Sequence, residues 1–320
     1  MCDFSILESS IRSILPDNLV LTDPQSRTFY GKDWIKDFTP APSLITLPET
    51  VEQVQALVQL CNRLKVAIVP SGGRTGLSGG ATATQGEIIL SLERMRKILE
   101  VNRADRTIRC QAGVALEQAQ AAASNAGLYF PVDFSSRGTA QIGGNIATNA
   151  GGIRVIKYGN FRQSVLGLTV VTGSGELLEL NGSLFKNNSG YDLRNLFIGS
   201  EGSLGIIVEA TLTLTTPPRE YARVLCGLSS LDAVLPLLTF CRDTISNVSA
   251  FEFMERFPYQ EVISRRALRD PLESSYPAYI IIECEVSSEA TRQEVFERCG
   301  EAYETGLIAD VVVSESAAQA

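Results

Sequence analysis

The stretch PSGGRTGLSGGA, residues 70–81, decides how this sequence folds, because it places five glycines among twelve residues. It directly follows the apolar run VAIV, residues 66–69, which predicts a buried strand. Glycine adopts positive φ and lets other atoms approach the main chain, so such a loop either turns sharply or binds an anionic group through its N–H groups. The rest of the chain has to distinguish these two explanations.

A helix is predicted immediately before this strand and loop. Thr50 and Gln53 have the spacing of a capping box, and apolar residues recur at helical intervals across 51–64. Beyond the loop, strands are predicted at 87–92 and 107–111, a helix at 116–125, and a hairpin in LGLTVVTGSGELLEL at 166–180. The first part of the chain is therefore expected to be an α/β layer followed by a sheet with antiparallel strands.

Two further glycine runs occur in the same part of the chain. IGGNIATNAGG, residues 142–152, adds four glycines and three small polar side chains, and GSEGSLG, residues 199–205, opens into a strand predicted at 206–215. None of the runs has the GK[ST] ending of a Walker A loop or the GxGxxG spacing of a dinucleotide fold. Three such runs exceed what turns require, and they favour a large anionic cofactor that binds along several backbone segments.

A domain boundary is predicted at Pro217-Pro218, because neither residue can donate to a strand ladder or continue a helix. Beyond it the expected order is strand, helix, strand, strand, helix, strand, at 221–227, 231–245, 250–255, 279–286, 289–304 and 308–315. This β-α-β-β-α-β order is that of the ferredoxin-like motif. The two domains are expected at 1–217 and 218–320. The helix-favouring residues 315–320 are explained by an ordinary frayed tail or by a chain cut inside a further helix.

Composition excludes several classes of protein. The 320 residues are 44% hydrophobic and carry a net charge of −8, which argues against a nucleic-acid partner because such binding needs clustered Lys and Arg. No apolar stretch approaches the roughly 20 residues that span a bilayer. The first residues, MCDFSILESSIRSILPDN, lack the pattern of a signal or transit peptide. A cytoplasmic protein, at most peripheral to the inner membrane, is expected.

Cysteine and histidine usage limits the chemistry further. The seven cysteines are scattered, odd in number and without a CxxC pair, so they are interpreted as small buried hydrophobes rather than as disulfides or zinc ligands. The sequence contains no histidine. It therefore lacks the commonest general base near neutral pH and the commonest metal ligand, and no metal ligands are assigned.

Three segments together carry a family resemblance: PSGGRTGLSGG, FPVDFSSRGTAQIGGNIATNAGGIRVIKYG and NNSGYDLRNLFIGSEGSLGIIVEATL. They resemble the flavin domain of the vanillyl-alcohol-oxidase-type (PCMH-type) FAD oxidoreductases. Within that family they are most similar to the D-2-hydroxyacid dehydrogenases, a group that includes D-2-hydroxyglutarate dehydrogenase, FAD-dependent D-lactate dehydrogenase and the glycolate oxidase flavin subunit. AFEFME, residues 250–255, resembles the same group.

The resemblance implies non-covalent FAD, because neither histidine nor cysteine occurs in the first two runs, where some family members attach the flavin. It gives the pyrophosphate to the first run, the flavin and its linker to the segment from Asp133 to Gly152, and the ribityl and adenine portions to the third run. The implied contacts are Ser71, Gly72, Gly73, Arg74, Thr75, Gly76, Ser78, Gly79, Asp133, Ser135, Ser136, Gly143, Gly144, Asn145, Thr148, Asn149, Gly151, Gly152, Glu201, Gly202, Gly205 and Ile207. For Arg74 alone, a solvated loop charge is an equal alternative.

The catalytic residues stay unassigned at this stage. In the resembled dehydrogenases the base and the ligands of a divalent metal are histidines with an acidic partner in a later stretch, and none can be carried over. Glu252, Glu283 and Glu285 are alternative acids, although a solvated sheet face explains the last two more simply. Tyr191-Asp192 is interpreted as packing and capping, and Arg194 as a helix-surface residue.

The sequence therefore predicts an α+β protein: a two-part PCMH-type FAD-binding domain followed by a ferredoxin-like cap domain that lacks the family's carboxy-terminal segment. The expected activity is FAD-dependent dehydrogenation of a D-2-hydroxyacid to the 2-oxoacid, with hydride transfer to flavin N5. The expected electron acceptor is a quinone, a cytochrome or an electron-transfer flavoprotein, and a homodimer is the expected assembly. The alternative is a flavin-binding module or truncated fragment without dehydrogenase activity.

Overall fold

The computed structural model describes residues 3–314, which divide into two compact units. The first unit contains residues 3–150 and 160–216, and the second contains 151–159 and 217–314. The chain thus enters the second unit twice, first for nine residues and then after Thr216. The predicted boundary at Pro217-Pro218 divides the chain only once, so it does not account for residues 151–159 in the second unit. The expected helix at 315–320 lies outside the described residues.

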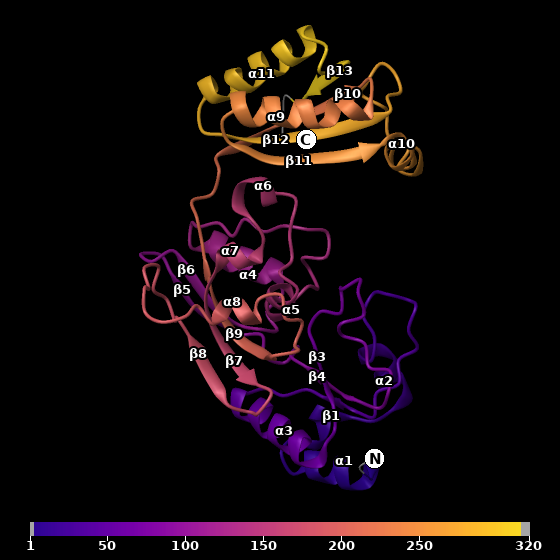
Figure 1. The fold of residues 1–320 in the computed structure, drawn as a ribbon, viewed down its shortest axis with the longest axis vertical. Helices are drawn as coiled ribbons and strands as arrows, with labels where there is room; N and C mark the ends of the chain where they lie inside the picture. The colour runs from indigo at the N-terminus through magenta and orange to yellow at the C-terminus, as the bar shows by residue number, and fades with distance from the viewer. Residues whose placement is uncertain (1–2, 315–320) are drawn as a thin grey trace. The chain divides into compact units, whose positions relative to one another are not determined.

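The first sheet of the first unit contains the strand that leads into the first glycine run (Figure 1). Its strand order is β1-β2-β4-β3, with β2, β4 and β3 parallel. The predicted capping box is present, since Thr50 accepts from the Gln53 amide and the Gln53 side chain returns to the cap. The elements are α1 (Phe4–Arg12), β1 (Val20–Leu21), α2 (Pro24–Tyr30), β2 (Ile45–Thr46), α3 (Val51–Leu64), β3 (Ile68–Ser71) and β4 (Ile88–Ser91).

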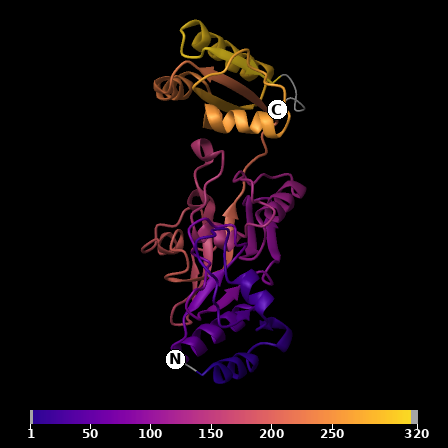
Figure 2. The same cartoon turned by 90° about the vertical axis from the view of Figure 1, so that its right-hand side faces the viewer.

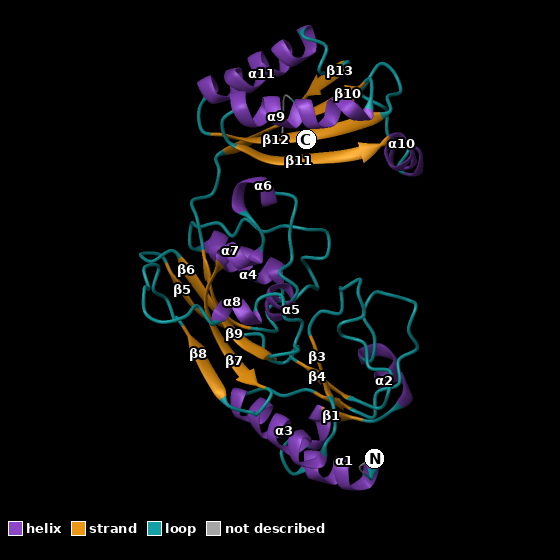
Figure 3. Ribbon diagram, in the orientation of Figure 1, coloured by secondary structure: helices purple, strands orange, loops and turns teal. Residues whose placement is uncertain are grey.

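The second sheet of the first unit is antiparallel, with strand order β5-β6-β9-β7-β8. The predicted hairpin is present as β7 and β8, and the core behind the sheet includes Phe130 and Phe161 packed edge to face at 5.6 Å. Short helices joined by long loops belong to this part (Figure 3). The elements are β5 (Ile98–Asn102), β6 (Thr107–Gln111), α4 (Leu116–Asn125), α5 (Ile142–Ala147), α7 (Phe161–Ser164), β7 (Val165–Thr172), β8 (Leu177–Leu180), α8 (Arg194–Phe197) and β9 (Gly205–Thr213).

The second unit is built on an antiparallel sheet with strand order β11-β12-β10-β13. Helices α9 and α11 lie on one face of this sheet and share its apolar core (Figures 1 and 2). The predicted succession of strands and helices is observed, with an additional helix, α10, that the sequence did not indicate. The elements are α6 (Val155–Tyr158), β10 (Glu220–Leu228), α9 (Val234–Thr244), β11 (Val248–Glu255), α10 (Arg256–Arg265), β12 (Ala278–Val286), α11 (Glu289–Glu304) and β13 (Asp310–Val313).

The cysteines within the described residues are free and buried, as predicted. Burial raises the pKa of the Cys110 thiol to about 12, which keeps it protonated and unreactive. Within residues 3–314, no helix has the length and apolar character needed to cross a membrane.

Candidate functional site

The first glycine run begins where two parallel strands end together. Ser71 is the last residue of β3 and is paired in register with Ser91, the last residue of β4, and both side chains are buried. In parallel sheets, ligands bind beyond the carboxyl ends of the strands. The run therefore leaves the sheet at the edge where a ligand is expected.

Asp33 accepts a hydrogen bond from the backbone of this run. The sequence analysis did not identify this residue. Its carboxylate is buried and accepts from the amide of Gly79 at 2.9 Å and from that of Ile35 at 3.0 Å. Next to it, the amide of Trp34 donates to the carbonyl of Gly76 at 3.1 Å. Asp33 thus fixes the shape of the glycine run. A short acidic side chain beside tryptophan in KDWI was the only local signal for it.

Arg74 lies within the run and is not a solvated charge, so that alternative is wrong. Its guanidinium lies 4.5 Å from the ring centre of Phe29 and 4.7 Å from that of Tyr30, and it forms an ion pair with Glu93 at 3.8 Å. Burial, followed by the hydrogen bond to Glu93, raises the pKa of Tyr30 to about 12, so the phenol keeps its proton and donates. The backbone of Arg74 adopts a positive φ of 57°.

The second run forms α5 and the turn that follows it. Gly143 lies against Ala112, where an added Cβ would be 2.6 Å from the alanine Cβ, so the fold itself requires glycine here. Asn145 is buried on the same helix. Asn149 adopts a positive φ of 47° and accepts from the Arg162 amide at 3.0 Å, which fixes the end of the run.

The third run packs onto the end of α5. The amide of Gly199 donates to Ile146 at 3.1 Å, and the amide of Glu201 donates to Ala147 at 3.0 Å. Glu201 adopts a positive φ of 51°, which is rare for a residue with a side chain and is typical of functional segments. Its neighbour Gly202 has a φ of 82°.

The three runs converge in the first unit. A Cβ on Gly72 would lie 3.7 Å from Cα of Gly144, so the first run lies next to the second. A Cβ on Gly80 would lie 2.8 Å from Glu201 Oε2, which brings the first run to the third. Gly80 and Glu201, which are 121 residues apart in the sequence, thus lie at one place, as expected for a single binding site.

Buried polar atoms gather at this place without a hydrogen-bond partner among the described residues. They are Ser71 Oγ, Ser91 Oγ, Gln141 Oε1 and Asn145 Nδ2. A buried polar atom left unpaired costs about 1–3 kcal/mol, so native proteins rarely keep several together unless a ligand completes them. Ser91 and Gln141 were missed by the sequence analysis, although Gln141 directly precedes the second run and Ser91 ends a strand parallel to β3.

The glycines themselves distinguish what the fold needs from what a ligand needs. A Cβ at Gly73 would overlap the carbonyl oxygen of Thr139, so close packing explains that glycine. At Gly144 nothing lies within 4 Å of an added Cβ, and at Gly72 the nearest atom is 3.5 Å away, with no positive φ at either position. Neither close packing nor backbone conformation requires glycine at these two positions. An open cradle with unpaired polar atoms fits an anionic cofactor such as FAD.

The remaining predicted contacts are distributed less uniformly. Ser135 is exposed, and Asp133 pairs with Arg137 at 2.9 Å. Ile207 is buried in the core behind the second sheet, which leaves its backbone rather than its side chain for a ligand. The positions in or next to the converging runs are Thr75, Gly76, Ser78, Gly79, Ser136, Thr148 and Gly205, whereas Gly151 and Gly152 belong to the second unit.

The alternative acids occupy different environments. The prediction of a solvated sheet face for Glu283 and Glu285 is wrong: Glu283 is 3% exposed, and residues of the segment 151–159 cover both side chains. Burial alone would raise the pKa of Glu283, but the hydrogen bonds and charge of Arg154 hold it below its usual value. Desolvation raises the pKa of Glu252. Within residues 3–314, no group of three or more acidic or cysteine side chains could hold a metal ion.

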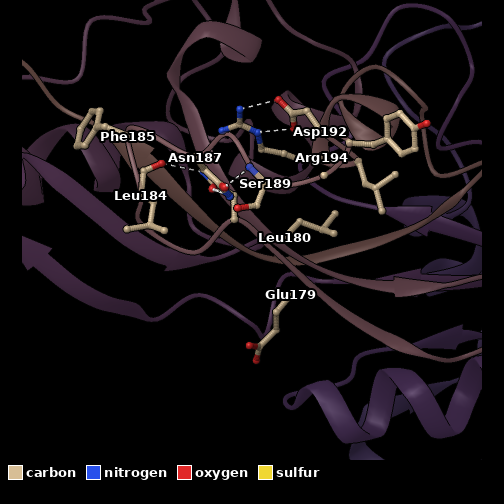
Figure 4. Close-up of a pocket in the computed structure, with 12 residues that line it drawn as sticks. Glu179, Leu180, Leu184, Phe185, Asn187, Ser189, Asp192 and Arg194 are labelled. Carbon is tan, nitrogen blue, oxygen red and sulfur yellow. Dashed lines mark hydrogen bonds and ion pairs between the residues drawn. The ribbon is translucent and has the colours of Figure 1, made fainter.

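A pocket of about 190 Å³ lies away from the glycine runs, in the loop between β8 and α8 (Figure 4). Its polar groups are engaged with each other: Arg194 binds Asp192 at 2.7 Å, and Asn187 donates to Asn181 at 2.6 Å. Arg194 also donates to the carbonyls of Val165 and Leu166, so it is not a simple surface residue. Tyr191 is 93% exposed, which makes its predicted packing role wrong. The predicted capping role of Asp192 is wrong as well, because the N-cap of α8 is Leu193 with no side-chain cap hydrogen bond, and Asp192 accepts from the side chains of Arg194 and Asn195 instead.

Comparisons with known proteins agree with this geometry. Residues 42–181 match the family described as FAD binding domain, and residues 217–320 match FAD linked oxidases, C-terminal domain. The chain is 46% identical to D-2-hydroxyglutarate dehydrogenase of Stutzerimonas stutzeri (strain A1501) over 322 residues, covering 100% of this chain and 68% of that protein. It is 49% identical to the D-2-hydroxyglutarate dehydrogenase of Xanthomonas citri pv. viticola, covering 97% of this chain and 66% of the relative. The chain therefore spans about two thirds of the length of these relatives.

Solved structures share the fold at low sequence identity. An alkyldihydroxyacetonephosphate synthase matches with a TM-score of 0.81 at 20% identity, over 97% of this chain and 60% of its own. A p-cresol methylhydroxylase matches with a TM-score of 0.76 at 17% identity, over 97% of this chain and 65% of its own. The chain therefore shares the mixed α/β fold of these two structures.

Proposed function

The chain belongs to the family of FAD-linked oxidoreductases that includes the D-2-hydroxyglutarate dehydrogenases, and on that premise we propose that the whole protein is an FAD-dependent D-2-hydroxyacid dehydrogenase acting on D-2-hydroxyglutarate. The convergence of three glycine runs around unpaired buried polar atoms carries the cofactor part of this proposal. The relatives at 46% and 49% identity support the substrate. They favour a dehydrogenase over the alternative of a flavin-binding module without activity.

The cofactor would accept, at flavin N5, the hydride that leaves the α-carbon of the hydroxyacid. The chain's own residues bind and orient it. The amides of the first run donate to an anionic group, with Asp33 keeping the run in shape and Arg74 adding positive charge beside it. Ser71 Oγ and Asn145 Nδ2, which have no hydrogen-bond partner within residues 3–314, would form hydrogen bonds with the cofactor. The catalytic base stays unassigned, because the printed sequence has no histidine.

We propose that FAD contacts lie along all three runs and that binding is non-covalent. The absence of histidine from the sequence and the burial of the described cysteines support dissociable binding. The proposed domains are a flavin domain at 1–217 and a cap at 218–320. The strand order β13-β10-β12-β11 with two helices on one face supports a ferredoxin-like cap.

The remaining features are proposed from the resemblance alone. The electron acceptor would be a quinone, a cytochrome or an electron-transfer flavoprotein, and the assembly would be a homodimer. A cytoplasmic location, peripheral to the inner membrane at most, agrees with the net charge of −8.

The test is an anaerobic titration of the purified whole protein. Its visible spectrum should show oxidised flavin, and D-2-hydroxyglutarate should bleach the flavin band while the L-enantiomer should not. A flavin band that neither enantiomer bleaches would contradict the dehydrogenase. A protein that binds no flavin at all would contradict the cofactor site.

A further inference from the structure

Residues 151–159 form a closed excursion from the segment that carries the second glycine run. Its base is fixed in the first unit, where the amide of Phe161 donates to Ala150 at 3.0 Å and the amide of Arg162 donates to Asn149 Oδ1 at 3.0 Å. Between these two bonds the chain belongs to the second unit and includes the short helix α6. The excursion therefore starts and ends beside a residue of the proposed FAD site.

Arg154 anchors the excursion through a two-point ion pair. Its Nε lies 2.7 Å from Glu283 Oε1, and its Nη2 lies 3.2 Å from Glu283 Oε2. Arg154 is 8% exposed and Glu283 is 3% exposed. A planar guanidinium that meets a carboxylate at two points fixes orientation as well as distance.

Other groups on the same sheet face complete this anchor. Arg223 donates to Glu283 Oε2 at 3.0 Å, and Ser249 donates to Glu283 Oε1 at 3.0 Å. The ring of Tyr221 lies 4.7 Å from the Arg154 guanidinium. Three strands of the sheet, β10, β11 and β12, therefore contribute to holding one arginine of the excursion.

A second contact holds the far side of the excursion. Lys157 forms an ion pair with Glu285 at 2.6 Å, and the hydroxyl of Tyr158 donates to the same carboxylate. Stability alone does not explain this use of charge, because well-packed apolar residues stabilise a buried interface at least as well as a buried ion pair does. The two-point geometry of the Arg154–Glu283 pair instead fixes a single orientation of the excursion on the sheet.

We infer that Arg154 and Glu283 are positioning residues for cofactor binding: their pair fixes the excursion on the sheet of the second unit and thereby orients Asn149 and the glycines that follow it. This inference rests on the proposed FAD site, because that site gives Asn149, Gly151 and Gly152 their contact with the flavin. Neither residue is assigned a contact with cofactor or substrate.

The test compares Arg154→Met with Arg154→Lys in the full chain. In Arg154→Met, Glu283 keeps Arg223 and Ser249, so the carboxylate stays paired and the sheet is preserved. The matched control is Arg298→Met, which removes an exposed ion pair with Glu301 on α11 of the same unit. Two quantities are measured on flavin-free protein: the rate of cleavage after Lys157 by a lysine-specific protease, and the Kd for FAD from flavin fluorescence.

Arg154→Met should speed cleavage after Lys157 and raise the Kd for FAD about tenfold, the scale seen when a group that orients a ligand-binding residue is removed. Arg154→Lys should give an intermediate Kd, and Arg298→Met should leave both quantities unchanged. Faster cleavage with an unchanged Kd in Arg154→Met would assign the pair a structural role only and overturn the inference.

Two further outcomes separate this inference from the proposed function. If Arg154→Met does not fold, Arg154→Lys decides, because it keeps the charge and loses only the two-point geometry: an unchanged Kd in it would overturn the inference. If the unaltered protein does not bind FAD, the FAD site itself is wrong, and the inference fails with it. Binding by the unaltered protein together with unchanged binding by both variants would leave the FAD site intact and reject only the positioning role.

Discussion

Each unit buries a polar cluster, and the two clusters differ in how their hydrogen bonds are completed. At the glycine runs, the side-chain atoms Ser71 Oγ and Asn145 Nδ2 are buried without a hydrogen-bond partner among the described residues. In the second unit, Glu283 is equally buried but receives donors from Arg154, Arg223 and Ser249. A protein satisfies its own buried polar groups where they serve the fold, and it leaves them open where a ligand completes them. The contrast supports the first cluster as the proposed cofactor site and the second as the anchor of a segment that borders it.

The largest effect expected from breaking this contrast is in the second unit. Glu283→Gln removes the charge shared by Arg154 and Arg223, which leaves the buried Arg154 and the half-buried Arg223 without their carboxylate. Removing one partner of a buried ion pair costs about 3–5 kcal/mol. Urea denaturation followed by circular dichroism should show this loss at neutral pH. A loss below about 1 kcal/mol would show that the pair is not an integral part of the unit.

The same residue determines a pH dependence with a defined sign. Burial would raise the pKa of Glu283, but the hydrogen bonds and charge of Arg154 lower it below the unfolded value of about 4.3. Its contribution to stability is therefore complete above the unfolded pKa and is lost as the pH falls through the folded pKa. Glu283→Gln should flatten the stability curve in that acidic range.

The next effect separates two adjacent glycines. Gly144→Ala fills open space on α5 and improves helix propensity by up to about 1 kcal/mol, so the flavin-free protein should be no less stable. The added methyl group occupies the proposed cradle, so the Kd for FAD should rise about 100-fold, equivalent to about 2.7 kcal/mol. Unchanged FAD affinity in Gly144→Ala would exclude this position from the site.

Gly143→Ala is the matched control for that comparison. Its Cβ would lie 2.6 Å from the Cβ of Ala112, so the flavin-free protein should lose stability. Thermal unfolding of the two flavin-free variants checks the distinction. Equal midpoints would contradict the division between glycines required by the fold and glycines required by a ligand.

A smaller effect is expected at Asp33, which shapes the first run without belonging to it. Asp33→Ala leaves the amides of Gly79 and Ile35 without their acceptor, at a cost of about 1–3 kcal/mol that should appear in both stability and FAD affinity. Asp33→Asn keeps one acceptor oxygen and should recover part of each. FAD affinity that is unchanged in Asp33→Ala would show that the run keeps its shape without this carboxylate.

The smallest effect compares two buried serines. Ser71→Ala removes a hydroxyl that has no partner in the described part of the chain, so the flavin-free protein should gain about 1 kcal/mol while FAD binding weakens. Ser249→Ala removes a hydroxyl that donates to Glu283, so the flavin-free protein should lose about 1 kcal/mol. Losses of equal size in both flavin-free variants would mean that the two clusters do not differ.

Local sequence signals predicted elements whose ends carry a recognisable capping or turn residue. The capping box of Thr50 and Gln53 located α3, and the predicted bounds of β6, α4 and α11 agree with the structure. Helix α10 was missed, because it has no side-chain cap and buries only Tyr259. The three glycine runs themselves indicated a large anionic cofactor bound along several backbone segments, and the family resemblance identified it as FAD and assigned a portion of it to each run.

The errors came from contacts between distant parts of the chain. Glu283 was expected on a solvated face because its cover, Arg154, lies 129 residues away in the sequence. Arg74 was given an equal chance of solvation because the rings of Phe29 and Tyr30 that enclose it belong to another segment. Ser91 and Gln141 could not be predicted as site residues, because only the pairing of β3 with β4 and the convergence of the runs place them there. Periodicity describes single elements, whereas burial of charge depends on tertiary packing.

The most direct test of the account is backbone hydrogen exchange of the flavin-free protein, measured with and without added FAD. FAD should slow exchange at residues 72–80, 143–149 and 199–205 together and leave residues 246–253, beside Ser249, unchanged. Protection of all three runs would establish them as one cofactor site. If FAD does not slow exchange at the runs, or slows it only elsewhere, the central claim that the unpaired polar atoms and open glycines bind FAD is contradicted.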